Sequence, residues 1–143
     1  MIWNLESHKQ KAKDQSAVRV LSNIHSKSIR NAIWSLNETG IVSASFDETC
    51  AFTDAETGKE VNRLRHDFIL TSVATHLTDE NMIICGSKDK VISWDVRTSK
   101  PAKVYKSSMG QVQDLLFLNE KEFVSCGDIV RYIPQEYFNG AFF

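Results

Sequence analysis

The chain contains 143 residues, of which 42% are hydrophobic and 24% are charged, a composition typical of one globular domain and not of a disordered or membrane-embedded chain. Lys and Arg number 17 and Asp and Glu 18, so the near-neutral charge argues against a surface that coats phosphates, and direct nucleic-acid contact is not expected. No apolar run approaches the ~20 residues that span a bilayer, and the three cysteines lack disulfide or zinc spacing. We therefore expect an intracellular protein with no membrane partner, no metal and no cofactor.

Strand signals dominate, because short apolar or β-branched runs alternate with turn residues and no segment keeps a 3.6-residue apolar period for three turns. In chain order, strands are expected near 2–4, 16–21, 29–34, 40–45, 48–54, 59–64, 70–76, 81–87, 90–95, 101–106, 111–118 and 122–126. A polar, lysine-bearing loop at 6–15 separates the first two. The sequence therefore predicts an all-β fold.

Two stretches of the chain follow the same order of residues about 41 positions apart. Each begins with a histidine, His25 or His66, and the second ends in Trp94-Asp95 where the first has Thr53-Asp54. A period of about 40 residues ending in Trp-Asp is the signature of a four-stranded propeller blade. We therefore expect full units at 25–65 and 66–106, the end of a preceding unit at 1–24, an incomplete unit at 107–128 that reaches only its second strand, and a tail without repeat pattern at 129–143.

These motifs resemble the WD-repeat β-propellers over roughly residues 1–128. The resemblance implies a partial, open propeller with two full four-stranded blades and two incomplete blades. In that family a His, a Ser or Thr, an Asp and a Trp of one blade form a hydrogen-bonded network, because a buried indole N–H and a buried carboxylate both need partners.

The resemblance also implies which residues form these structural networks. They are His25, Ser43 and Asp47 in the first full blade, and His66, Asp89 and Trp94 in the second. Both blades depart from the family pattern: Thr53 replaces Trp in the first, and Cys85 stands at the hydroxyl position in the second. The turn before Trp94 is also one residue shorter than its counterpart.

Within the family, several stretches are similar to relatives of a pre-mRNA-processing factor. They are Phe46-Asp47, Thr53–Gly58, Asp67-Phe68, Ile84–Gly86, Trp94–Thr98 and Leu115–Leu118. This closer resemblance implies a nuclear, protein-binding propeller with a link to spliceosomal particles.

Propellers of this kind usually bind other proteins instead of transforming substrates. The resemblance therefore implies a non-catalytic interaction scaffold whose partners are peptide segments or assembly subunits. An enzyme is not expected. His76 and Asp79 are near Cys85 and could be imagined as a base beside a nucleophile, but Cys85 occupies a strand position that the family uses for its network. Partner contacts are expected in the loops that enter first strands, at Lys27, Arg30, Asp67, Phe68 and Met109.

An open arc of blades leaves apolar faces at both ends. If each bare face exposes on the order of 400 Å², the lost burial is roughly 10 kcal/mol per face. We therefore expect the chain to need further blades in trans or self-association. The alternative hypothesis is a truncated or mispredicted product with no independent activity.

Overall fold

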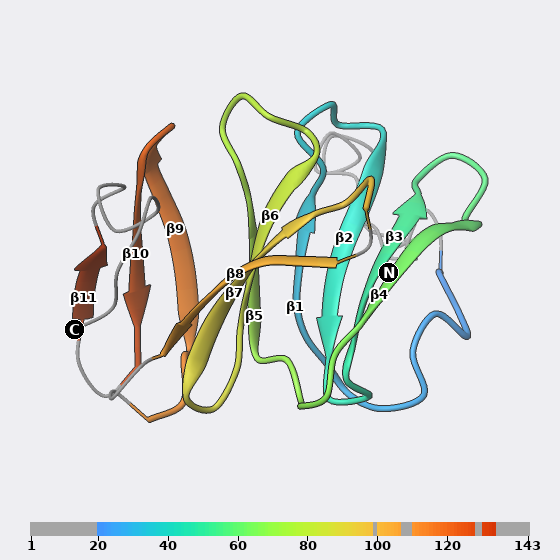
Figure 1. Ribbon diagram of the computed structural model, residues 1–143. Helices are drawn as coiled ribbons and strands as arrows, with labels where there is room; N and C mark the ends of the chain where they lie inside the picture. Colours follow the sequence, from blue (N-terminus) through green and yellow to red (C-terminus); the bar gives the residue numbers. More distant parts are fainter. Residues whose placement is uncertain (1–19, 99, 107–109, 128–129, 134–143) are drawn as a thin grey trace, which may run out of the picture.

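The computed structural model describes residues 20–98, 100–106, 110–127 and 130–133, and these form eleven strands in three antiparallel sheets (Figure 1). No helix occurs in this described part of the chain, and none there could span a membrane. The predicted all-β fold is confirmed.

The first two sheets each contain four strands in chain order. The first consists of β1 (Ile29–Trp34), β2 (Gly40–Ser45), β3 (Thr49–Asp54) and β4 (Glu60–Arg65). The second consists of β5 (Ser72–Thr75), β6 (Met82–Gly86), β7 (Lys90–Asp95) and β8 (Lys100–Lys106). Each sheet is one blade of the kind that the repeat predicted.

The third sheet extends further along the chain than the sequence predicted. It contains β9 (Asp114–Asn119), β10 (Glu122–Cys126) and β11 (Val130–Ile133), in the order β11-β10-β9. The sequence predicted that this unit ends at residue 128 with its second strand, yet β11 pairs with β10 from within the expected tail. The tail lacks Trp-Asp, but β-branched and aromatic residues at 130, 132 and 133 favour a strand there.

The sheets stand side by side as an open arc and do not close into a ring (Figure 1). The first strands of successive sheets are neighbours: β1 contacts β5, and β5 contacts β9. Of the unit expected at 1–24, the strand at 2–4 lies outside the described residues. So does most of the strand at 16–21, and residues 20 and 21 are not part of a strand.

The core consists of two apolar layers, one in each space between neighbouring sheets. The layer between the first and second sheets is formed by Val42, Ala44, Cys50, Leu64, Leu70, Val73, Ile83, Cys85, Ile92 and Trp94. The layer between the second and third sheets is formed by Ala74, Ile84, Val91, Tyr105, Val112, Leu115, Phe117 and Phe123. Because side chains alternate across a strand, Ile83 and Ile84 of β6 enter different layers.

Gly86 at the end of β6 allows the close approach of the third unit. A Cβ atom at this position would lie 2.7 Å from Cγ1 of Val112, closer than real Cβ contacts. The backbone of Val112 in turn donates a hydrogen bond to the carbonyl of Ser87, at 2.9 Å. A glycine is therefore required at this position by the packing of one blade against the next.

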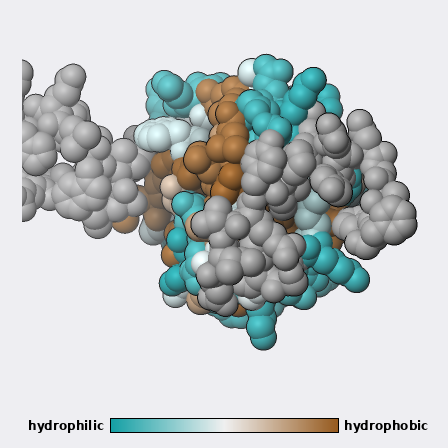
Figure 2. Space-filling model, turned by 90° about the vertical axis from the view of Figure 1, so that its left-hand side faces the viewer, coloured by the Kyte–Doolittle hydropathy of each residue, from teal (hydrophilic) through white to brown (hydrophobic). Residues whose placement is uncertain are grey.

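The outer face of the third sheet carries apolar side chains that no described sheet covers. On β9, Leu115 and Phe117 are buried, while Leu116 and Leu118 are 62% and 47% exposed. Figure 2, which views the molecule from this end, shows an apolar stripe on the surface. The alternation matches a strand built to be covered on both faces.

Leu64 and Leu116 provide a matched test of this layered core. Leu64 is 1% exposed between the first two sheets, so Leu64→Ala should lower the free energy of unfolding by about 2–5 kcal/mol. Leu116→Ala on the outer face should change it by less than about 1 kcal/mol. Urea denaturation followed by tryptophan fluorescence measures both, and equal losses in the two variants would contradict the layered core.

Candidate functional site

The first sheet carries a hydrogen-bonded network centred on His25, whose side chain is 1% exposed. Its Nδ1 lies 3.0 and 3.1 Å from the two carboxylate oxygens of Asp47. Its Nε2 lies 2.8 Å from Oγ of Ser43 in the middle of β2. The structure thus brings together the three residues expected to form the network of this blade.

Asp47 accepts further hydrogen bonds that the sequence analysis did not anticipate. Thr49 donates from Oγ1 at 2.6 Å and from its N–H at 3.1 Å, and the N–H of Ser26 donates at 2.9 Å. Burial alone would raise the pKa of Asp47, but the hydrogen bonds from Thr49, Ser26 and His25 outweigh it and hold the pKa well below its usual value. Asp47 is therefore ionised at neutral pH.

Arg63 on β4 also joins this network, and no sequence motif indicated it. Its guanidinium donates to Oγ1 of Thr49 at 2.7 Å, to the carbonyl of Ile24 and to the carboxylate of Glu60. One of its nitrogens lies 4.0 Å from Asp47 Oδ2. A buried carboxylate is thus held near a cation, in a blade where Thr53 replaces the family's indole donor.

The second sheet does not form the equivalent network. The rings of His66 and Trp94 meet edge-on, with centroids 4.5 Å apart. Asp89, which was expected to join them, is exposed, and no hydrogen bond joins it to either ring in the described structure. The buried nitrogens of both rings have no hydrogen-bond partner there.

Turn length explains the difference between the two aspartates. In the first sheet five residues separate the paired residues Ala44 and Cys50, and one of them, Glu48, takes a left-handed conformation with φ of 68°. In the second sheet only four residues separate the paired residues Gly86 and Val91, and the N–H of Ser87 bonds the carbonyl of Lys90 at 2.9 Å across Lys88 and Asp89. The shorter hairpin leaves the Asp89 carboxylate in solvent.

Burial without a partner also changes the titration of His66. Desolvation lowers its pKa to about 4, and the nearby charge of Asp67 only partly opposes this shift. The imidazole is therefore neutral at pH 7. Its role in this blade is to fill the apolar layer beside Trp94 and Phe68.

The structure does not bring Cys85 and His76 together as nucleophile and base. Cys85 is fully buried in the layer facing the first sheet, where contact with Cys50 and burial raise the pKa of its thiol. His76 lies toward the third sheet, with its ring 5.0 Å from that of Phe117 and its Nε2 2.8 Å from the carbonyl of Glu120. No group of three or more potential metal ligands occurs among the described residues.

Four of the five residues expected to contact a partner lie in the described part of the chain. Lys27 and Asp67 are exposed, and so is Arg30, whose guanidinium lies 5.0 Å from the Phe46 ring centroid. Phe68 instead packs against the apolar layer. Met109 lies outside the described residues.

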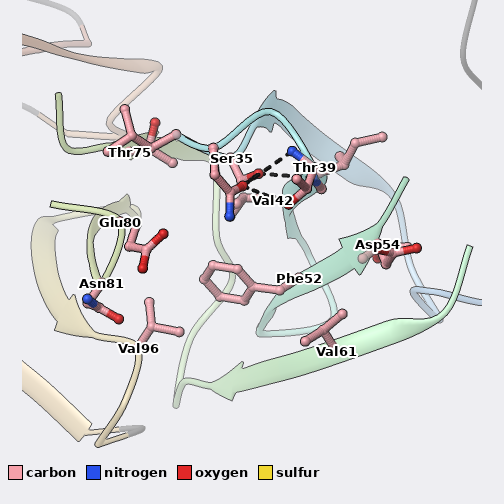
Figure 3. Close-up of a pocket in the computed structure, with 15 residues that line it drawn as sticks. Ser35, Thr39, Val42, Phe52, Asp54, Val61, Thr75, Glu80, Asn81 and Val96 are labelled. Atoms are coloured by element: carbon pink, nitrogen blue, oxygen red, sulfur yellow. Dashed lines mark hydrogen bonds between the residues drawn. The ribbon is translucent and has the colours of Figure 1, made fainter. Parts of the chain in front are cut away.

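A groove of about 270 Å³ lies between the first two sheets, at the end opposite the β2–β3 turn. Figure 3 shows the Phe52 ring at its centre, between Val61 and Val96 on one side and the β1–β2 turn on the other. Glu80 and Asn81 of the second sheet face it. The sequence does not reveal this inter-sheet groove, because its residues come from six separate segments and share no motif.

No family model matches the chain. It is 39% identical over 107 residues to WD repeat-containing protein 25 of Mus musculus, a match that covers 73% of this chain and 20% of that protein. It is 28% identical over 108 residues to pre-mRNA-processing factor 17 of Homo sapiens, covering 73% of this chain and 19% of that protein.

The chain belongs to the WD-repeat β-propeller family. The solved structure titled "Structure of U3-55K" shares its fold, with a TM-score of 0.66 and 18% identity over 75% of this chain and 35% of that one. The chain spans about a fifth of the length of the curated relatives it matches. The expected family and the expected partial, open propeller are both confirmed.

Asp47 and Asp89 form a matched pair for testing the network of the WD-repeat blade. Asp47→Asn removes a buried charge that accepts several hydrogen bonds, and it should lower the free energy of unfolding by about 2 kcal/mol. Asp89→Asn removes an exposed charge and should change it by less than about 0.5 kcal/mol. Urea unfolding at pH 7 measures both, and a larger loss for Asp89→Asn would contradict the role given to turn length.

His66 should make stability fall on mild acidification. Its pKa is about 4 in the folded chain against a usual 6.5, so the unfolded chain takes up the proton first as the pH drops below 6.5. We expect a loss of about 2 kcal/mol between pH 7.5 and pH 5.0. The pH dependence should be reduced in His66→Phe and kept in His76→Phe, as measured by urea midpoints at both pH values; equal dependence in both variants would contradict it.

Proposed function

We propose that this chain is part of a non-catalytic WD-repeat scaffold that binds other proteins, in a nuclear assembly that processes pre-mRNA. The observation that supports a scaffold is the stacking of the blades, the first of which uses its polar network residues within its own fold. Asp47, the most strongly perturbed carboxylate of the described residues, is surrounded by hydrogen-bond donors of its own blade. Both of its carboxylate oxygens accept hydrogen bonds from residues of this blade.

The name of one relative, pre-mRNA-processing factor 17, supports the nuclear, splicing-related part of the proposal. Its similarity and that of WD repeat-containing protein 25 extend over 73% of this chain. We further propose that other blades, in trans or from a second copy, cover the outer faces where Trp34 and Leu116 are 51% and 62% exposed.

Affinity capture tests the proposed scaffold. The tagged chain, incubated with nuclear extract, should retain pre-mRNA-processing proteins in stoichiometric amounts, and ribonuclease treatment should not release them, because the contacts are protein–protein. An Asp47→Asn chain serves as a folding control and should retain less. Retention of chaperones alone, or complete release by ribonuclease, would overturn the proposal.

A further inference from the structure

We propose that the inter-sheet groove binds a protein segment that places one apolar side chain on Phe52 and Val61 and a Lys or Arg side chain beside Glu80. This inference rests on the proposed scaffold function and specifies the partner chemistry of one of its surfaces.

The size of the groove favours a side chain of a partner protein. Its volume of about 270 Å³ lies just below the range of roughly 300–1,000 Å³ typical of small-molecule sites. A cavity of this size holds one or two large side chains. Such pockets receive the anchor residues that supply most of the affinity in protein interfaces.

A β-bulge exposes apolar surface at this groove. The register between β3 and β4 shifts after Phe52, which pairs with Asn62, so that Val61 is left without a partner residue. Val61 is 71% exposed, whereas Phe52 and Val96 behind it are half-buried. Bulges redirect side chains out of the strand alternation, and here the result is an apolar floor open to solvent.

The charge of the groove determines which charged side chain of a ligand it would favour. Among the described residues, two carboxylates, Asp54 and Glu80, line it, and no Lys or Arg does. Asp54 accepts hydrogen bonds from the N–H and hydroxyl of Thr57, so it is engaged in its own turn. Glu80 is exposed, and no hydrogen bond or ion pair to its carboxylate is present among the described residues. A cationic side chain complements it, while a phosphate would be repelled.

The wall of the groove is already ordered before a ligand arrives. In the β1–β2 turn, Asn37 Oδ1 accepts hydrogen bonds from Ser35 Oγ at 2.6 Å and Thr39 Oγ1 at 2.8 Å, and Gly40 N–H donates to Ser35 Oγ at 3.0 Å (Figure 3). On the other side, Val96 N–H donates to the carbonyl of Asn81 at 2.8 Å. A preformed wall lowers the entropic cost of binding.

Three fluorescein-labelled peptides test the proposed chemistry by anisotropy titration of the 143-residue chain. They are GSRKLFKRSG, its acidic counterpart GSEELFEESG, and GSRKSGKRSG, which lacks the apolar pair. The first should bind at least about tenfold more tightly than either of the others, because it alone matches both the floor and the carboxylate. Equal affinity for all three peptides would overturn the proposal.

Matched variants locate the binding. Glu80→Lys should weaken GSRKLFKRSG by about tenfold and strengthen GSEELFEESG, while Glu120→Lys in the corresponding β9–β10 turn should change neither by more than about twofold. Val61→Lys should weaken the first peptide by about tenfold. Ala102→Lys, at the equivalent bulge between β7 and β8, should leave its affinity unchanged within about twofold.

The outcomes separate this inference from the scaffold function. If Glu120→Lys or Ala102→Lys weakened binding as much as its counterpart, the groove would not be the site. If Glu80→Lys left the affinity for all three peptides unchanged and the variant still captured pre-mRNA-processing proteins, the groove proposal would fail and the scaffold would stand. Loss of capture in Glu80→Lys together with the peptide effect would support both.

Discussion

The structure depends on one constraint: each sheet carries apolar side chains on both faces, and it buries both only between two other sheets. The second sheet meets this condition, since Ile83 and Ile84 are adjacent, both fully buried, and enter different layers. The first and third sheets each have one neighbour in the described structure. Their outer faces therefore expose Trp34 and Leu116. The packing rule that stabilises the interior thus also indicates which surfaces remain for further contacts.

Much of this architecture could be predicted from the sequence, because turn residues and the Trp-Asp period fix the strands within a blade. The limits of β1 and β2 match the expected 29–34 and 40–45. β5 begins at Ser72 and not at residue 70, because the N–H of Leu70 bonds the carbonyl of Ser45 in the first sheet. A contact between blades of this kind leaves no periodic signal. β11 escaped prediction for a related reason: its pairing with β10, and not a repeat motif, makes it part of the sheet.

The networks show how small departures from the family pattern act physically. The turn before Trp94, one residue shorter, was visible in the sequence, and in the structure the equivalent aspartate is outside the network while His66 and Trp94 are buried without polar partners. The contribution of Arg63 could not be read from any motif. It depends on the register that places β4 beside β3 and on the position of Thr49 between Arg63 and Asp47. The repeat thus predicts the strands more reliably than it predicts the side-chain hydrogen bonds between them.

The inter-sheet groove arises at a position where the two full blades have the same backbone arrangement but different side chains. Both full blades shift register at the same point between third and fourth strands, yet the unpaired residue is Val61 in one and Ala102 in the other. The bulge is present in both blades, but the side chain at the bulge differs between them. Likewise, Glu80 and Glu120 occupy corresponding turns, and Glu80 lines the groove together with Val61 of the neighbouring sheet. Recognition in such a chain therefore resides in individual residues carried by a common frame, which is why an inspection for repeats finds the frame and passes over the groove.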